Sequence, residues 1–258
     1  MHAEQRERAI FEALKPSGFV TYRDLETQLG ASPATIRRDL ARLEGAGRLV
    51  RVHGGAKLPG AVSNDDAPGL AGTPFVQSIT QNLSAKQAIG RAAAALCVAG
   101  EGIMIDGGTT TLQMCAHLAG LNLQVLTNSL HIVDALLAQD GTRILVPSGT
   151  VFREQNIILA PSGEDSMPRF HAPKLFMGAA AAGPHGVMQS DVILVAAQRR
   201  MIDRAERVVL LVDGSKFHSS SGAIVCGWEE IDVLITEAIE GELRRRIEAA
   251  GVEVIVAA

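Results

Sequence analysis

The run SPATIRRDL at 32–40 restricts what this chain can fold into more than any other stretch. Ser32 suits the N-cap of a helix, where its hydroxyl accepts a hydrogen bond from a free backbone N–H, and Pro33 suits the first helical position, where no donor is lost. The apolar residues that recur at helical spacing and predict a buried stripe are Ile36, Leu40 and Leu43. We therefore expect an amphipathic helix over 33–44.

A second helical pattern precedes this helix at the distance of a helix-turn-helix. Residues 22–29 place Leu25 and Leu29 on one face. Gly30 suits the turn between the two helices, because glycine adopts backbone conformations that are closed to other residues. In such a motif the first turns of the second helix enter the major groove of DNA.

Polar and basic residues flank the buried stripe where a second helix of this kind would enter the groove, namely Thr35, Arg37 and Arg38. Arginine in the major groove pairs with guanine or binds phosphates. Taken alone, an Arg-Arg pair is more typical of the solvated face of a surface helix. The helix-turn-helix pattern around this pair favours DNA recognition.

The segment after the second helix predicts a β wing. Residues 48–52 alternate as a strand, which ends at the sequence HGGA. The whole stretch TIRRDLARLEGAGRLVRVHGGA, 35–56, resembles the DNA-binding module of DeoR-type bacterial repressors. The resemblance implies that the helix over 33–44 reads operator DNA and that a helix over 2–14 supports it. The predicted DNA-binding residues are Tyr22, Ser32, Thr35, Arg37, Arg38, Arg42, Arg51 and His53.

Charge is divided unevenly along the 258 residues. Residues 1–58 hold 10 Lys and Arg against 7 Asp and Glu, and the remainder holds 14 against 21. A basic part supplies the phosphate-binding contribution to DNA affinity, whereas an acidic body is repelled by the duplex and suits another task. Residues 59–74 are rich in Pro and Gly and show little periodicity. We predict a DNA-binding domain at 1–58, a linker at 59–74 and an effector-binding domain at 75–258.

The part after the linker alternates apolar, strand-like runs with helical patterns. The predicted strands are 102–106, 123–127, 143–147, 174–177, 208–212, 233–236 and 252–256. This order predicts an α/β domain with a mainly parallel sheet. The fold class we expect is therefore a small N-terminal winged helix-turn-helix domain followed by a larger α/β sensor domain.

The loop DGGTTT at 106–111 is the strongest candidate ligand site, because ligands of open α/β sheets lie beyond the carboxyl ends of the strands. Two glycines allow close approach of the backbone, and the N-terminus of the following helix offers free N–H groups. With the threonine hydroxyls these groups form a predicted anion cradle that suits a phosphate. Asp106 would repel a phosphate and is assigned to a sugar hydroxyl. An ordinary strand-to-helix turn capped by threonine is the alternative.

Two more strand ends carry polar residues: TNS at 127–129 and DGSK at 213–216, where Lys216 brings a full positive charge. Each is structurally ordinary when taken alone. The sequences IDGGTTT, LTNS and LLVDGSKF are similar to the effector-binding half of DeoR-type repressors, whose fold resembles ribose-5-phosphate isomerase. The resemblance implies a phosphorylated sugar or sugar-acid effector, and Lys86 matches a family position without a derived role. The predicted effector-binding residues are Asp106, Gly107, Gly108, Thr109, Thr110, Thr111, Thr127, Asn128, Ser129 and Lys216.

These patterns predict a transcriptional regulator, a repressor of a carbohydrate-utilisation operon that binds double-stranded operator DNA as a homodimer or homotetramer. The alternative is an isomerase-like enzyme with an appended DNA-binding domain. Related isomerases take their general base from a DGADE-like segment, whose nearest counterpart is MGAAAAG at 177–183, and alanine cannot abstract a proton. Glu154 and Asp191 are the carboxylates left open for such a role. We expect no enzyme activity.

Several classes of protein are disfavoured by what the sequence lacks. Cys97, Cys115 and Cys226 lie far apart without a CxxC pair, so we expect free thiols and no metal or other cofactor. No signal-like N-terminus and no apolar run of about 18 residues occurs, which predicts a cytoplasmic protein without a membrane partner. The low aromatic content, 3%, disfavours a single-strand binder built on base stacking.

Overall fold

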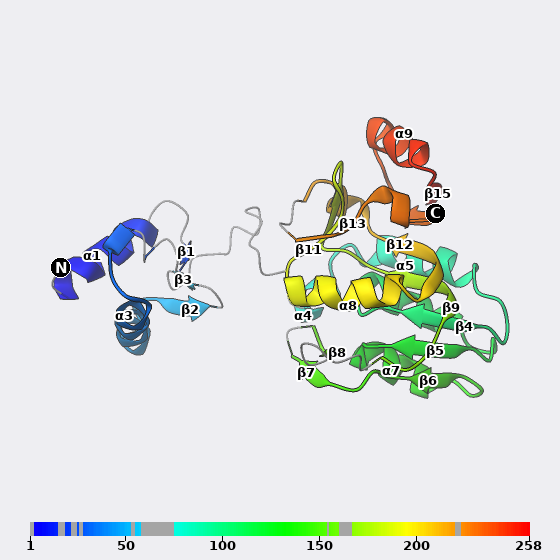
Figure 1. Ribbon diagram of the computed structural model, residues 1–258, viewed down its shortest axis with the longest axis horizontal. Coiled ribbons are helices and arrows are strands. Elements are labelled where there is room, and N and C mark those ends of the chain that lie inside the picture. The colour runs from blue at the N-terminus through cyan, green and yellow to red at the C-terminus, as the bar shows by residue number, and fades with distance from the viewer. Residues whose placement is uncertain are drawn as a thin grey trace. The chain divides into compact units, whose positions relative to one another are not determined.

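The computed structural model describes residues 3–14, 19–21, 25, 28–52, 55–57, 75–153, 155–159, 167–219 and 223–258. The chain divides into two compact units, Met1–Ala67 and Pro68–Ala258 (Figure 1). The predicted linker, 59–74, lies outside the described residues.

The described residues of the first unit form helices and a small antiparallel sheet. Its described elements are Ala3–Leu14 (α1), Phe19–Thr21 (β1), Pro33–Gly45 (α3), Val50–Val52 (β2) and Gly55–Lys57 (β3), with strand order β1-β3-β2. The predicted stripe of Ile36, Leu40 and Leu43 is fully buried and packs with Ile10 and Leu14 of α1. Of the predicted helix over 22–29, the described residues are helical. Strands β2 and β3 pair antiparallel and form the predicted wing.

The second unit is built on a seven-stranded sheet whose strand pairs are all parallel. In spatial order its strands are Glu253–Val256 (β15), Val233–Thr236 (β14), Ala205–Leu211 (β12), Ala172–Met177 (β9), Gly102–Ile105 (β4), Gln124–Thr127 (β5) and Arg143–Leu145 (β6). Each of the seven predicted strands is present. The central strands are largely apolar because both faces of the sheet are covered.

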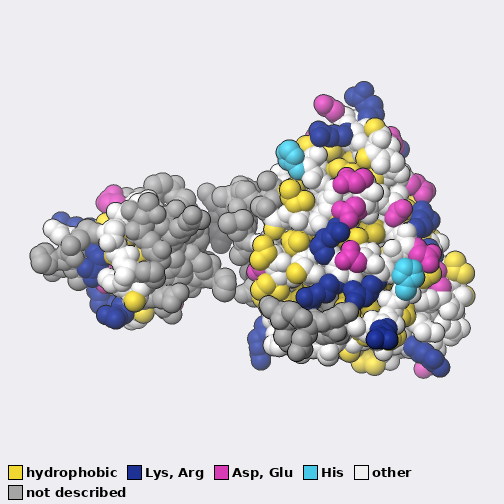
Figure 2. Space-filling view, in the orientation of Figure 1, with side chains coloured by type: hydrophobic (Ala, Val, Ile, Leu, Met, Phe, Trp, Pro, Cys, Tyr) yellow, Lys and Arg dark blue, Asp and Glu magenta, His cyan; other side chains and the backbone are white. Residues whose placement is uncertain are grey.

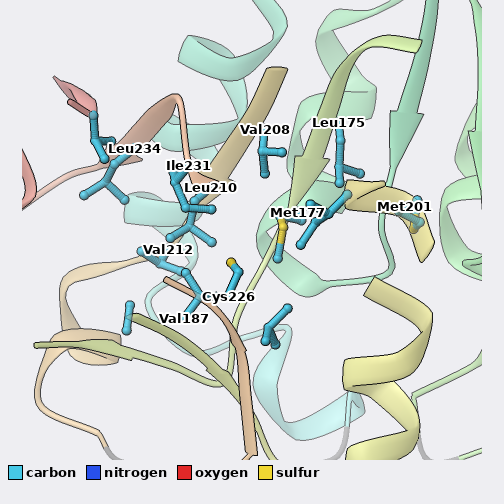
Figure 3. Close-up of a cluster of buried hydrophobic side chains, with 14 of the residues drawn as sticks. Leu175, Met177, Val187, Met201, Val208, Leu210, Val212, Cys226, Ile231 and Leu234 are labelled. Atoms are coloured by element: carbon cyan, nitrogen blue, oxygen red, sulfur yellow. The ribbon is translucent and has the colours of Figure 1, made fainter. Parts of the chain in front are cut away.

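Alternating side chains of the strands feed two separate cores. Met104 of β4 joins the core under Val192–Ile202 (α8) and Gly241–Ala249 (α9), which Figure 3 shows from close by. Ile103 and Ile105 point to the opposite core. That core is covered by Leu83–Ala94 (α5), Thr109–Met114 (α6) and Leu130–Leu137 (α7). The strand period of two thus places helices on both faces.

Short antiparallel strands that the sequence did not predict surround the carboxyl end of the sheet. They are Thr150–Phe152 (β7) with Ile157–Leu159 (β8), and Ala181–Gly183 (β10) with Gly186–Gln189 (β11) and Ala223–Cys226 (β13). Glycine and alanine have low strand propensity, which hid β10 and β11 in the sequence. Single-turn elements complete the unit: Phe75–Ser78 (α4), Cys115–His117 (η1), Gly214–Phe217 (η2) and Trp228–Glu230 (η3). Among the described residues, no helix combines the length and the apolarity that a bilayer crossing needs.

Gly90 sets the distance between α5 and α6, which yields a first prediction. A Cβ at this position would lie 2.6 Å from the backbone carbonyl carbon of Gln113. Gly90→Ala should therefore force the helices apart and lower the free energy of unfolding by about 1–3 kcal/mol, measured by urea unfolding. Gly241→Ala is the matched control, because a Cβ there meets nothing within 4 Å. Equal stability of the two variants would contradict this account.

Candidate DNA-binding surface and effector site

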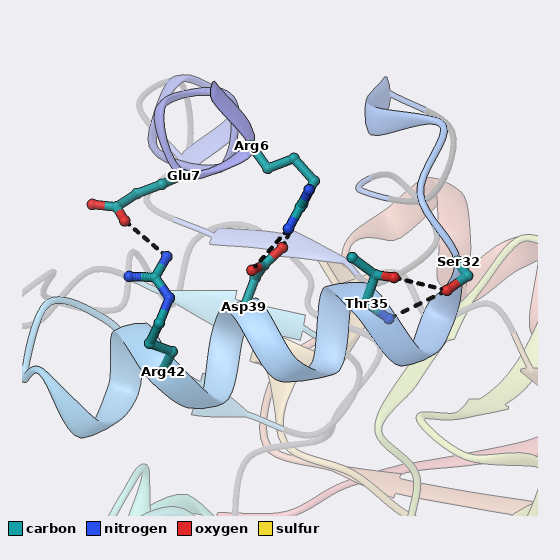
Figure 4. A network of polar contacts seen from close by, with 6 residues as sticks. All are labelled: Arg6, Glu7, Ser32, Thr35, Asp39 and Arg42. Carbon is teal, nitrogen blue, oxygen red and sulfur yellow. Dashed lines mark hydrogen bonds and ion pairs between the residues drawn. The ribbon is translucent and has the colours of Figure 1, made fainter. Parts of the chain in front are cut away.

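The N-terminus of α3 is fixed by its own cap. Ser32 adopts an extended backbone conformation, and its Oγ accepts a hydrogen bond from the Thr35 backbone N–H at 3.3 Å. The hydroxyls of Ser32 and Thr35 also share a hydrogen bond of 2.9 Å (Figure 4). Both residues were predicted to contact DNA, and the cap holds both at the end of the helix that would enter the major groove. One free N–H of the first turn is satisfied in this way.

Ion pairs between α1 and α3 hold the two helices together (Figure 4). The nearly buried Asp39 accepts hydrogen bonds from Arg6 Nε at 2.6 Å and Arg6 Nη2 at 3.3 Å, a two-pronged arrangement of the stronger, charge-assisted kind. Glu7 accepts from Arg42 Nη2 at 2.8 Å and also pairs with Arg48. The bond from Arg42 is the main cause that lowers the pKa of Glu7. These pairs fix how α3 is presented.

The other six predicted DNA-binding residues fall into three groups in the structure. Arg38 is exposed on α3, and Arg42 shares its half-exposed guanidinium with Glu7. Arg37 and Arg51 lie on α3 and β2, and their side chains are not among the described parts. The two predicted residues outside the described ranges are Tyr22 and His53. Together, α3 and the β2–β3 wing form a candidate surface for duplex DNA.

In the second unit, the loop after β4 is organised around the buried carboxylate of Asp106. Asn128 Nδ2 donates to Asp106 Oδ1 at 3.2 Å, and Gln198 Nε2 donates to Asp106 Oδ2 at 2.6 Å. Asn128 Oδ1 in turn accepts from the Gly107 backbone N–H at 2.9 Å. Gln198 Nε2 also donates to the Gly178 carbonyl at 2.9 Å. The ends of β4, β5 and β9 and the helix α8 are thereby joined.

Burial raises the pKa of Asp106 to about 6, although the hydrogen bonds from Gln198 and Asn128 act in the opposite direction. Both carboxylate oxygens of Asp106 accept hydrogen bonds from side chains of the protein. Gln198 is 2% exposed, and its Oε1 has no hydrogen-bond partner among the described residues. Sequence reasoning missed Gln198. Gln198 could have been noticed in the sequence as a polar residue on the apolar side of the helical pattern VILVAAQRRMI.

The three threonines after Gly107 and Gly108 have different surroundings. Thr111 is fully buried, and its hydroxyl lies 2.8 Å from the Asp106 carbonyl and 3.0 Å from the Gly108 carbonyl, so it closes the loop. Thr110 is nearly buried in the first turn of α6. The hydroxyl of Thr109 lies 3.4 Å from that of Ser78. The predicted cradle is thus a loop held by its own hydrogen bonds, and the Thr111 hydroxyl makes two of them.

The polar residues after β5 are also largely engaged by the protein. Thr127 Oγ1 accepts from the Ser129 N–H at 3.2 Å, and Ser129 Oγ caps α7 by accepting from the Ile132 N–H at 3.4 Å. The β7–β8 hairpin covers this region: Ile158 N–H donates to the Asn128 carbonyl at 2.7 Å. The Ile157 side chain of this hairpin lies close to Gly107. A Cβ added at position 107 would lie 2.5 Å from Ile157 Cγ2. Only glycine fits at that point of the loop.

Two lysines lie near Asp213, at the end of β12. Asp213 caps the turn η2, which carries Lys216. Lys86 is 2% exposed, and its Nζ donates to the Ser78 carbonyl at 2.6 Å. Burial is the main cause that lowers the pKa of Lys86, while Asp213 raises it and Lys216 lowers it, so all three charges are within electrostatic reach. Through Ser78, which contacts both Lys86 and Thr109, Lys86 adjoins the threonine loop.

A small, mainly apolar hollow adjoins the same loop. Its lining residues are Asn128, Pro147, Ile158, Leu159, Met167, Ala197, Arg200 and Met201. Arg200 is the one charged residue of this lining, and sequence reasoning did not single it out. Lys and Arg side chains gather over α8 on the face shown in Figure 2. Asn128 lines the hollow and hydrogen-bonds to Asp106 and Gly107 of the loop, so the two features are continuous.

The part of the chain that the structure describes contains neither a metal-binding cluster nor a cysteine with a lowered thiol pKa. There, no group of three or more His, Cys, Asp or Glu side chains is placed to hold a metal ion. Cys97, Cys115 and Cys226 are free, and burial raises the pKa of each thiol to about 12. Such thiols are poor nucleophiles at neutral pH.

A winged helix-turn-helix followed by an α/β domain with a polar site at its strand ends defines a transcriptional regulator with a sensor domain. A family model described as the DeoR-like helix-turn-helix domain matches residues 6–61, and one described as the DeoR C terminal sensor domain matches residues 81–238. The chain belongs to the DeoR family. The HTH-type transcriptional regulator UlaR of Escherichia coli (strain SMS-3-5 / SECEC) is 30% identical over 257 residues, which cover 99% of each chain. UlaR of Escherichia coli (strain K12 / DH10B) matches with the same identity and coverage.

Solved structures give a weaker likeness. Ribose 5-phosphate isomerase A from Methanocaldococcus jannaschii aligns with a TM-score of 0.38 and 14% identity over 53% of this chain and 55% of that one. A score of this size is too low to support an inference about fold or activity.

The recognition surface predicts a separable loss of DNA binding. Arg37→Ala with Arg38→Ala should weaken binding to the protein's own promoter fragment by at least about tenfold, because each lost arginine pairing is worth about 1–3 kcal/mol. Fluorescence anisotropy at fixed salt measures this. Arg91→Ala with Arg143→Ala removes the same charge from exposed positions of the sensor unit and should leave DNA affinity near that of the wild type. Unchanged affinity of the first variant would refute the assignment.

The buried Asp106 carboxyl predicts a pH dependence of stability with a defined sign. Its pKa is raised from 3.8 to about 6, so between these values the unfolded chain loses a proton that the folded chain keeps. The folded state therefore loses stability as the pH rises through this window, by up to about 3 kcal/mol. Asp106→Asn cannot titrate. Urea unfolding should show the wild type losing stability relative to this variant from about pH 4 to about pH 6, with a level difference above about pH 7. A difference constant over the whole range would contradict the raised pKa.

Proposed function

We propose that this DeoR-family regulator represses a carbohydrate-utilisation operon and leaves its operator when a phosphorylated sugar or sugar acid binds the sensor domain. The α3 helix and the wing bind the operator, and the polar strand ends of the sensor bind the effector. The regulator acts in the cytoplasm as a homodimer or homotetramer. Two recognition helices then lie about 34–36 Å apart, or a multiple of this, on a palindromic or repeated site.

The observation that carries this proposal is the position of two lysines beside the threonine loop. Lys86 is buried and donates to a neutral carbonyl, and Lys216 lies within electrostatic reach of it. Asp213 is a carboxylate within electrostatic reach of Lys86. A buried cation with incomplete charge compensation favours an anion nearby, and backbone N–H groups at the start of α6 add donors for it. A phosphate supplies both the charge and several acceptor oxygens.

The rest of the effector is assigned to the hollow between Asn128 and Arg200. The guanidinium of Arg200 suits a carboxylate, because its fork of donors matches carboxylate geometry. This arrangement favours an effector with a phosphate at one end and an acid group at the other. Asp106 supports the loop by holding Asn128 and Gln198, and its predicted contact with a sugar hydroxyl is retained as part of the proposal.

We further propose that the sensor domain has no catalytic activity. The segment after β9, where related isomerases carry their general base, reads Gly178 followed by alanines. Asp191, one of the two carboxylates left open for such a role, caps α8 by accepting from the Ile193 N–H at 2.8 Å. The other, Glu154, lies outside the described residues. The curated relatives above are named as transcriptional regulators, in agreement with this reading.

Thermal-shift assays with matched compounds test the proposal. Effector binding stabilises the folded chain by RT ln(1 + [L]/Kd), about 2.7 kcal/mol at a concentration of about 100 Kd. We expect stabilisation by 6-phospho-D-gluconate or a related phosphorylated compound and not by its dephosphorylated form. The compound that stabilises should also weaken binding to the promoter fragment by about 5–150-fold. No shift with any phosphorylated compound would contradict the cradle.

Variants locate this binding. Thr110→Ala with Lys216→Ala should abolish the shift and the release of DNA while DNA affinity stays intact, whereas the exposed control Arg245→Ala should respond as the wild type. Arg200→Met should reduce the preference for 6-phospho-D-gluconate over D-glucitol 6-phosphate, which lacks only the acid group. Full inducibility of the Thr110/Lys216 variant would refute the assignment of these residues.

A further inference from the structure

We infer that the segment 75–82 transmits the effector signal from the cradle to the chain that leads to the DNA-binding unit. The inference rests on the proposed function and adds the element that couples the two activities. This segment contains α4 and the turn before α5, and it directly follows the predicted linker in sequence. Three of its residues, Phe75, Ser78 and Asn82, contact three different parts of the effector site.

The first contact is an aromatic stack. The rings of Phe75 and His131 lie 4.1 Å apart with an angle of 9° between their planes, and Phe75 is 3% exposed. His131 follows the Thr127–Ser129 loop as part of α7, and its Nε2 lies 3.0 Å from Asn156 Nδ2. The Asn156 carbonyl accepts from the Leu130 N–H at 2.9 Å. The stack thereby ties α4 to the hairpin loop that covers Gly107.

The second contact joins α4 to the proposed phosphate ligands. The Ser78 carbonyl accepts from Lys86 Nζ at 2.6 Å, and the Ser78 hydroxyl lies 3.4 Å from that of Thr109. A phosphate is a much stronger acceptor for these donors than a neutral carbonyl or hydroxyl. An arriving phosphate therefore draws Lys86 Nζ and the Thr109 hydroxyl toward itself and away from Ser78, which weakens the hold on α4.

The third contact reaches the turn that carries Lys216. Asn82 Nδ2 donates to Asp213 Oδ1 at 2.9 Å, and the same oxygen accepts from the Ser215 N–H at 3.2 Å. Asn82 has a left-handed backbone, φ 50°, so its side chain serves Asp213 rather than capping α5. A shift of the Lys216 turn toward a phosphate is transmitted to the position of Asn82.

These contacts give the segment two states. In one, α4 is held by the stack, by Ser78 and by Asn82; in the other, Lys86, Thr109 and the Lys216 turn engage phosphate and α4 is loosened. A ligand moves such an equilibrium only through its different affinity for the two states, and here the difference is the competition for Lys86 and Thr109. Because the proposed effector releases the operator, the held state is the one that binds operator.

Hydrogen exchange on the full-length protein tests the first step, with inorganic phosphate as the probe. Amides of 75–82 should exchange faster at saturating phosphate, while amides of the β15 edge strand should be unaffected. Thermal shift measured in parallel reports whether phosphate binds. Phosphate binding with unchanged exchange at 75–82 would overturn the inference while the proposed function stands, and absence of phosphate binding would overturn both.

Phe75→Leu tests the coupling, because it keeps apolar volume and removes the stack. Aromatic pairs of this kind correspond to about 2- to 10-fold in an equilibrium constant, so the variant should bind phosphate about 2- to 10-fold more tightly. Its affinity for the promoter fragment should already be reduced without phosphate, and the ratio of DNA affinities without and with phosphate should move toward one.

Phe170→Leu is the matched control. Phe170 lies against Gly102 at the amino end of β4, the end of the strand opposite the threonine loop. We expect it to retain the phosphate affinity and the affinity ratio of the wild type. A Phe75→Leu protein that behaves like this control would overturn the coupling role. If Phe75→Leu fails to fold, the exchange measurement on the wild type decides the question alone.

Discussion

The carboxylate of Asp106 is buried where the ends of β4, β5 and β9 meet α8, and the geometry of the sensor site depends on how it is satisfied. Asn128 and Gln198 donate to its two oxygens, at 3.2 and 2.6 Å. Desolvation of a charge is costly unless hydrogen bonds offset it, so these partners are held firmly in place. The glycine loop, the Asn128 side chain and the α8 residues beside the hollow are thus positioned by one buried group.

The DNA-binding unit uses the same principle on a smaller scale. Asp39 lies on the face of α3 that packs toward α1, and the two-pronged bond from Arg6 satisfies it. An arginine–carboxylate pair of this geometry fixes orientation as well as distance. The exposed residues of α3, Arg38 among them, are thereby presented in one defined direction. A recognition helix needs this, because base contacts depend on angle as well as on charge.

The sensor site combines rigid and competing interactions. The hydroxyls of Thr111, Thr127 and Ser129 hydrogen-bond to backbone groups, and ligand binding does not require these bonds to change. Lys86, by contrast, is a buried cation bound to a neutral carbonyl, an arrangement that a stronger acceptor can replace. A site that changes state on binding needs replaceable interactions, such as that of Lys86, next to the segment that connects it to the rest of the protein. The structure has them at Ser78, next to the predicted linker.

The sequence by itself determined the elements whose signals are local. The N-cap at Ser32, the stripe of Ile36, Leu40 and Leu43, and the seven apolar strands all follow from capping, periodicity and runs of apolar residues, and each is present. The polar loops at 106–111, 127–129 and 213–216 lie at strand ends for the same reason, and their role in ligand binding stays a prediction. The family resemblance added the biological role, which these local rules do not contain.

Only the tertiary structure decided which polar residues share a site. Gln198 is 92 positions from Asp106 in sequence, and no local pattern indicates that they meet. The short strands β10 and β11 were missed because glycine and alanine carry little strand signal, and the contacts of Ser78, Asn82 and Lys86 depend on how α4 and α5 cross the strand ends. Sequence rules act over a few residues, whereas the pairing of buried polar groups is settled by which distant segments the sheet order brings together.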